Sequence, residues 1–228
     1  MGGSAGALLA FDTSGPVGSV AVGIDGVVRA YRALEERTEH ASRLLPAIDE
    51  ALRAAGIGVG ELRAIVVGEG PGSFTGVRVA AATAKGLSVA LGVPLRPVSS
   101  LAAAAAAAGV QELRYALFDA RGERVYGACY RIGPDGLEAV TPPHPGELTE
   151  VLGLHVAGEA VFVGEGAARH RQRLEDAGCR VAADAGRERL AEGLLRCAGL
   201  GGAPEAPDAS AWEPRYVRGS SAERLWSA

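Results

Sequence analysis

The feature that most constrains this fold is an internal repeat of strand and turn signals. In the first half, an apolar run that ends in Phe-Asp (8–12) leads into a glycine-containing turn. A stretch in which small and apolar residues alternate (18–24) follows, and it ends in an Asp-Gly turn (25–26). The second half repeats this order at 115–119, 125–132 and 135–136. Alternating stretches that end in Asp-Gly predict β-hairpins. Each half therefore begins with a predicted β-meander.

A second pair of segments matches in the same order. Residues 66–70 and 162–166 each form an apolar run that enters a glycine turn and then a helical stretch. Chance likeness of short pieces is the alternative, but two matched pairs in one order favour a duplicated unit. We expect an α/β fold of two subdomains, residues 1–108 and 109–228, with the boundary near 106–112.

Two helices are predicted in the first half. The first has apolar residues at the i, i+3, i+4 spacing of an amphipathic helix and ends at Gly56. Pro46 should kink this helix or mark a restart. Its apolar positions are Ala41, Leu44, Leu45, Ile48, Leu52 and Ala55. The second runs from about residue 74 to 91, and most of its surface carries little bulk because of Gly76, Ala80, Ala81, Ala84, Gly86 and Ser88. Another helix can approach such a surface closely.

Composition excludes several classes of protein. A formal net charge of -4 argues against a broad basic face that grips nucleic acid unaided. The three cysteines are isolated, which indicates a reducing compartment rather than a disulfide framework. No apolar run approaches the roughly 20 residues that span a bilayer. We expect a cytoplasmic protein without a membrane partner.

The glycine turn at 68–76 has two interpretations. Its glycines and the following helix invite an anion-binding hypothesis, yet Ser73 and Phe74 stand where a phosphate loop requires other residues. The alternative is a tight strand-to-helix turn with Ser73 or Thr75 as N-cap. Likewise, Asp12-Thr13-Ser14-Gly15 resembles the first phosphate loop of actin-like ATPases and sugar kinases, or is a set of turn formers. Weak nucleotide binding would use Asp12, Thr13, Ser14, Gly70, Gly72 and Ser73.

Motifs for other chemistry are missing from the sequence. His40, His144, His155 and His170 form no i, i+3 or i, i+4 pair, so no metal site is predicted. No nucleophile elbow is present, and no catalytic residue is assigned. The aromatic and basic stretch 212–218 is expected to pack against the second domain, with an RNA or partner contact as the alternative.

The combined motifs resemble the bacterial TsaB (formerly YeaZ) family of threonylcarbamoyladenosine biosynthesis. The resemblance covers most of the chain and rests above all on 70–78 (Gly-Pro-Gly-Ser-Phe-Thr-Gly-Val-Arg); it continues at 11–14, 40–52, 84–87, 98–101, 119–121, 125–126 and 214–218. It implies an actin-like (ASKHA, ribonuclease H-like) fold. It also implies Ser100 and Ala104 at the positions of the metal-binding histidine pair of the related subunit TsaD.

The same resemblance implies a non-catalytic subunit that binds and activates TsaD and requires no cofactor. It also implies that the subunit joins a complex with TsaE, contacts tRNA only through its partners, and forms a homodimer when TsaD is absent. The implied partner surface comprises His40, Leu44, Leu45, Ile48, Leu52, Val77, Ala81, Ala84 and Ser88. The alternative is an actin-like ATPase or kinase that uses Asp12 and the glycine turn. A protease acting on TsaD finds little support without a nucleophile or metal motif.

Overall fold

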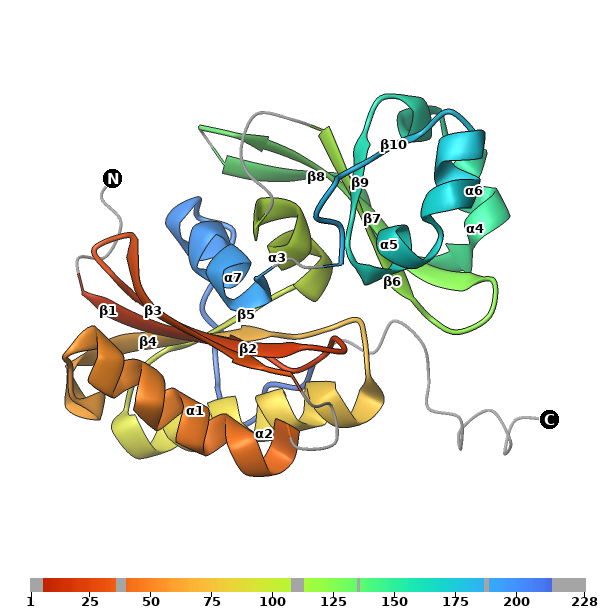
Figure 1. Cartoon of the computed structure of the whole chain (residues 1–228). Helices are drawn as coiled ribbons and strands as arrows, with labels where there is room; N and C mark the ends of the chain where they lie inside the picture. Colours follow the sequence, from red (N-terminus) through yellow and green to blue (C-terminus); the bar gives the residue numbers. More distant parts are fainter. Residues whose placement is uncertain (1–5, 36–39, 108–112, 135, 187–188, 215–228) are drawn as a thin grey trace.

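Two five-stranded sheets organise the computed structural model, which describes residues 6–35, 40–107, 113–134, 136–186 and 189–214 (Figure 1). The first sheet has the order β3-β2-β1-β4-β5, formed by β1 (Ala7–Asp12), β2 (Gly18–Ile24), β3 (Val27–Leu34), β4 (Leu62–Gly68) and β5 (Leu95–Val98). The second has the order β10-β9-β6-β7-β8, formed by β6 (Leu113–Asp119), β7 (Arg124–Gly133), β8 (Gly136–Glu147), β9 (Val161–Val163) and β10 (Arg180–Val181).

The two sheets follow the same path. In each, the first three strands pair antiparallel and the last two join in parallel beside the first. β1 therefore corresponds to β6, β2 to β7, and so on through β5 and β10. The predicted duplication is confirmed strand by strand. We call the part around the first sheet the first lobe and the part around the second sheet the second lobe.

The turn between β2 and β3 shows why the first meander forms. Asp25 and Gly26 have φ angles of 51° and 77°, and Ile24 faces Val27 across the turn. Positive φ at both central residues defines the tight turn whose twist matches that of the strands, and Asp-Gly tolerates it. The corresponding second-lobe turn includes Asp135, which lies outside the described residues.

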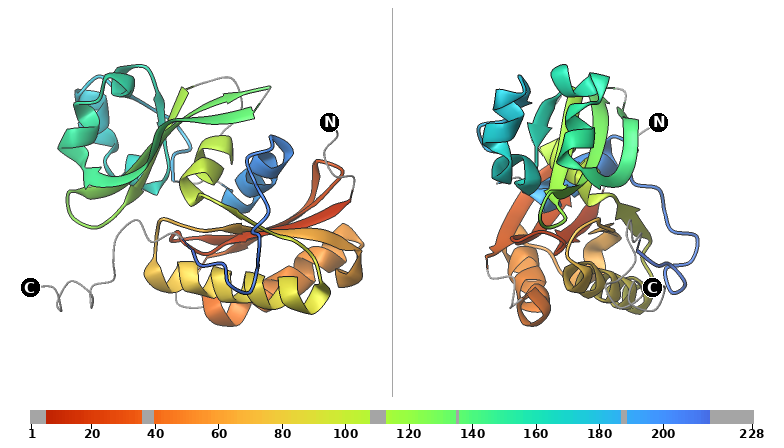
Figure 2. Two further views of the ribbon diagram at one scale, coloured as in Figure 1. Left: turned by 180° about the vertical axis from the view of Figure 1, so that it is seen from behind. Right: turned by 90° about the vertical axis from the view of Figure 1, so that its right-hand side faces the viewer.

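Helices α1 (His40–Ala55) and α2 (Phe74–Leu91) cover one face of the first sheet (Figure 2). Their buried side chains pack with Leu9, Phe11 and Ile65 in one core cluster. The predicted restart at Pro46 is wrong, because α1 is one continuous helix through it. Proline removes a single N–H, and Leu44, Ala47 and Ile48 on either side hold the helix on the sheet.

Two helices lie between the sheets, α3 (Ser100–Ala107) and α7 (Leu190–Gly199): α7 covers the other face of the first sheet, and α3 packs on β6 and β7 of the second sheet and against α7. The alanine run of α3 is buried from Ser100 to Ala106. At the crossing, a Cβ on Gly193 of α7 would collide with the carbonyl oxygen of Ala103. Small side chains therefore let the two helices approach closely between the lobes, and this core cluster includes residues of both sheets.

The second lobe carries shorter helices around its sheet. These are α4 (Leu148–Leu152), α5 (Glu165–Arg169), α6 (Arg171–Asp176) and the 3-10 turn η3 (His155–Gly158); the first lobe has the 3-10 turn η2 (Val59–Glu61). A separate core cluster lies beneath them and includes Tyr115, Leu117 and Phe162.

The C-terminal segment returns to the first lobe, which differs from the predicted division into 1–108 and 109–228. α7 packs on β1, β2 and β4, and the backbone N–H of Ala206 donates to the carbonyl of Leu95 at 2.8 Å. Trp212 packs beside the first-lobe core, so its predicted placement on the second domain is wrong; residues 215–218 of that motif lie outside the described residues. The first lobe thus comprises residues 6–107 together with 189–214.

Candidate functional site

Asp12 lies at the end of β1 with its carboxylate fully buried. One oxygen, Oδ1, accepts from the backbone N–H of Ser14 at 2.7 Å and from its hydroxyl at 2.6 Å. The other, Oδ2, accepts from the Ser100 hydroxyl at 2.5 Å. Both oxygens of this predicted nucleotide-site residue are therefore engaged by hydrogen bonds within the chain, which satisfy a buried charge.

The glycine turn packs directly onto this loop. A Cβ on Gly68 would collide with Asp12 Oδ2, and one on Gly76 would collide with the Thr13 carbonyl oxygen. The Thr13 hydroxyl donates to the Gly76 carbonyl at 2.6 Å. These glycines are therefore needed for close approach between two segments of the chain, a requirement that competes with an anion cradle.

The remaining predicted nucleotide-site residues lie in the same cluster. The Ser73 backbone N–H donates to the Ser14 carbonyl at 2.7 Å, and a Cβ on Gly72 would lie 2.5 Å from that oxygen. The Ser73 hydroxyl accepts from the Gly76 N–H at 3.3 Å, which confirms Ser73 as the N-cap of α2. Gly70 accepts from the Ser100 N–H at 2.8 Å. The structure thus brings all six residues together.

Ser100 begins α3 beside Asp12, and Ala104 follows one helical turn later, fully buried. The Ser100 hydroxyl also accepts from the Gly70 N–H at 3.2 Å. A hydroxyl and a methyl group thus stand at the two positions that the family resemblance predicts to correspond to the TsaD histidine pair. Among the described residues, no cluster of three or more His, Cys, Asp or Glu side chains is arranged to hold a metal ion.

The second lobe repeats the Asp12 turn at Asp119. Its Oδ1 accepts from the Arg121 N–H at 3.0 Å, as Asp12 Oδ1 accepts from Ser14, and its Oδ2 pairs with Arg169 at 2.7 Å. Nearby His170 is buried; burial, reinforced by Arg169, lowers the pKa of its imidazole. The carboxylate of Asp119 is therefore held by an arginine where that of Asp12 is held by Ser100.

The predicted partner surface divides sharply by burial. Leu45 is 55% exposed, whereas His40, Leu44, Ile48, Leu52, Val77, Ala81, Ala84 and Ser88 are all buried within the chain. The apolar spacing in the sequence marks the side of each helix that packs on the first sheet, which is not the side that faces solvent. These buried residues support the helices from behind and do not present side chains to a partner.

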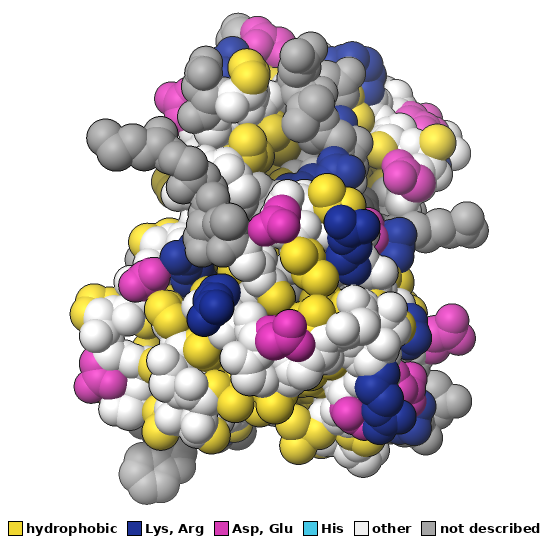
Figure 3. Space-filling model, turned by 90° about the vertical axis from the view of Figure 1, so that its left-hand side faces the viewer, with side chains coloured by type: hydrophobic (Ala, Val, Ile, Leu, Met, Phe, Trp, Pro, Cys, Tyr) yellow, Lys and Arg dark blue, Asp and Glu magenta, His cyan; other side chains and the backbone are white. Residues whose placement is uncertain are grey.

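The exposed side of α1 and α2 carries a different apolar set. Val89 is 63% exposed and Phe74 40%, and the guanidinium of Arg78 stacks over the Phe74 ring at 3.8 Å. Ala41, Ala82 and Ala90 are also exposed. Figure 3, which views the side at the left of Figure 1, shows hydrophobic side chains interspersed with polar and charged ones over the first lobe, in the lower half of the picture. We call Leu45, Phe74 and Val89 with these alanines the helix face. Sequence reasoning missed Phe74 and Val89.

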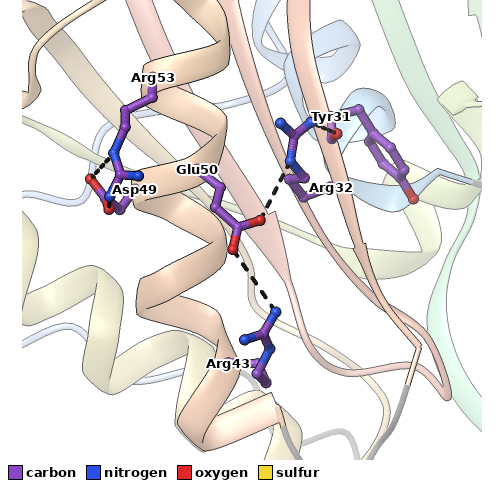
Figure 4. Close-up of polar contacts among 6 residues, drawn as sticks. All are labelled: Tyr31, Arg32, Arg43, Asp49, Glu50 and Arg53. Atoms are coloured by element: carbon purple, nitrogen blue, oxygen red, sulfur yellow. Dashed lines mark hydrogen bonds and ion pairs between the residues drawn. The ribbon is translucent and has the colours of Figure 1, made fainter.

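Ion pairs border α1 on its β3 side (Figure 4). Glu50 lies between Arg32 of β3, at 3.7 Å, and Arg43 of α1, at 3.9 Å. Asp49 pairs with Arg53 one turn along α1, on the side of the helix turned away from β3 (Figure 4). An apolar centre with a charged margin is typical of protein interfaces.

No helix in the part of the chain described by the structure is long and apolar enough to cross a membrane. The three cysteines are buried and unpaired with one another.

Comparison with known proteins gives consistent matches. Residues 35–189 match the family model described as TsaD: tRNA N6-adenosine threonylcarbamoyltransferase. The chain is similar to the tRNA threonylcarbamoyladenosine biosynthesis protein TsaB of Bacillus subtilis, with 32% identity over 96% of this chain and 97% of the relative. The TsaB of Haemophilus influenzae is 44% identical, over about half of each chain (52% and 51%).

Among solved structures, YeaZ from Pseudomonas aeruginosa has a TM-score of 0.76 and 32% identity, over 92% of this chain and 99% of that one. This likeness and the duplicated sheets confirm the predicted actin-like α/β fold.

Proposed function

From its membership of the TsaB family, we propose that this chain is a non-catalytic subunit that binds and activates TsaD. The observation that carries the proposal is the contrast between its two candidate sites. The carboxylate of Asp12 is engaged internally by Ser14 and Ser100, whereas Leu45 and Val89 extend into solvent. The chain thus offers a surface for a partner more readily than groups for chemistry.

The partner surface in this proposal is the helix face. It combines large and small exposed apolar side chains, so a helix pair of TsaD would approach the backbones closely at the alanines and bury Leu45. The same face serves a second copy of the chain when TsaD is absent. TsaE joins the assembled complex, tRNA is met through the partners, and the complex works in the cytoplasm without a cofactor bound to this chain.

Replacing Leu45 by Asp tests the proposal. The variant should fold normally, because Leu45 is 55% exposed. It should lose co-purification with TsaD and reduce threonylcarbamoyl transfer to tRNA in a reconstituted system by at least about tenfold, which corresponds to about 1.4 kcal/mol. A charged group forced into an apolar interface core explains the loss.

Val27→Asp is the matched control, because Val27 is 52% exposed and belongs to β3 rather than to the helices. It should retain binding and activity. Wild-type transfer by the Leu45→Asp complex would exclude the helix face as the docking surface. Ile48→Asp is unsuitable, because Ile48 is 4% exposed and the substitution would test folding.

A further inference from the structure

A cavity of about 300 Å³ opens in the second lobe, where β7 begins and β8 ends. It lies outside the Asp12 cluster and the helix face. Its wall combines an apolar side with three charged groups, and the residues that matter are Arg124, Val125, Tyr126, Pro145, Glu147 and Glu150. The volume is at the small end of those that hold metabolites.

The charged groups of this cavity are unusual in being held apart. Arg124 and Glu147 lie directly opposite each other on β7 and β8, yet no hydrogen bond or ion pair joins the side chain of Arg124 to any described residue. On the same two strands, Arg131 and Glu138 are also directly opposite and do pair, at 3.9 Å. Opposite charges facing each other across a ladder ordinarily attract. The cavity therefore separates a guanidinium and a carboxylate that are both available to a ligand.

The third charged group is fixed in position. Glu150 Oε2 accepts from the backbone N–H of Glu147 at 2.9 Å, which directs this carboxylate toward the rim beside Glu147. No described residue donates to its second oxygen. Val125, which is fully buried, and Pro145 supply the apolar floor and wall.

We propose that this cavity binds a free α-amino acid. The planar guanidinium of Arg124 matches a ligand carboxylate, to which it can donate two parallel hydrogen bonds. An ammonium group has three donors, which suits the paired carboxylates of Glu147 and Glu150. The ligand side chain then lies against Tyr126 and Pro145. This assignment goes beyond the docking function and does not depend on it.

Isothermal titration of the full chain with L-alanine, L-leucine and L-lysine tests the proposal. At least one should bind with a Kd below about 1 mM, and its N-acetyl and carboxamide derivatives should each bind at least about tenfold more weakly, because each lacks one charge. Arg124→Gln and Glu150→Gln should weaken binding by a similar factor. Arg131→Gln on the same strand is the control and should leave the affinity unchanged.

Three results would overturn the site. One is absence of binding for all three amino acids. Another is equal affinity for the N-acetyl derivative, which would indicate an anion site. The last is an equal loss in Arg131→Gln, which would indicate a general effect of charge.

Discussion

At the scale of single residues, Asp12 illustrates how one sequence pattern serves two purposes. An acidic residue at a strand end followed by Thr-Ser-Gly is typical of a phosphate loop, but here its carboxylate joins two segments of the first lobe. Ser14 belongs to its own turn and Ser100 to the start of α3. The aspartate therefore links the first strand to the central helix.

Replacing Asp12 by Ala should lower the free energy of unfolding by about 2–5 kcal/mol, because buried donors on Ser14 and Ser100 lose their acceptor. Urea denaturation measures the change. Asp49→Ala is the control: its pair with Arg53 is exposed, so the loss should stay within about 0.5 kcal/mol. ATP turnover by the wild-type chain that vanishes in Asp12→Ala at unchanged stability would instead favour the ATPase alternative.

At the scale of elements, the crossing of α3 and α7 is a helix contact that depends on a glycine. Gly193→Ala should destabilise the protein by about 1–3 kcal/mol, because its methyl group meets the Ala103 carbonyl. Gly199→Ala on the same helix is the matched control, since its Cβ meets nothing within 4 Å. Thermal unfolding distinguishes the two. Equal melting temperatures would show that the helices separate without cost.

The elements themselves were largely predictable from sequence. Asp25-Gly26 specified its hairpin because few residue pairs tolerate two positive φ angles, and the bounds of α2 follow from Ser73 and the glycine after Leu91. Which apolar residues of a helix face the sheet and which face solvent was not predictable. Leu44 and Leu45 are chemically identical neighbours, and only the position of the sheet decides that one is buried and the other exposed. Likewise, the alanine run indicated a helix with small side chains but not that this helix lies between the two sheets.

At the scale of the whole molecule, the return of the chain to the first lobe matters most. β1, β2 and β4 bury one face beneath α7, which comes from the far end of the sequence. Arg96 pairs with Glu205 and Lys85 with Glu213, which fasten the returning segment along the outside of the lobe. The duplicated halves are therefore not independent domains, a point that repeats within the sequence alone do not convey.

A chain shortened to residues 1–108 should fail to fold cooperatively, because the sheet face around Ala10, Ala21 and Val66 loses its α7 cover. Circular dichroism and urea titration should show a broad transition, and a hydrophobic dye should bind. Joining 189–214 to that fragment through a flexible linker should restore a sharp transition. A cooperative transition in 1–108 alone would contradict this view of the first lobe.

The position of α7 near the end of the chain also determines when the first lobe can be completed during translation. α3 ends at residue 107 and α7 begins at residue 190. At the roughly 5–20 residues per second at which ribosomes elongate chains, α7 emerges on the order of ten seconds after α3. Throughout that interval the first sheet is exposed on one side in the nascent chain. Among the described elements, α7 is the last helix to be translated, and it completes the lobe whose synthesis began first. A chain that terminates before residue 190 therefore leaves the first lobe without its α7 cover.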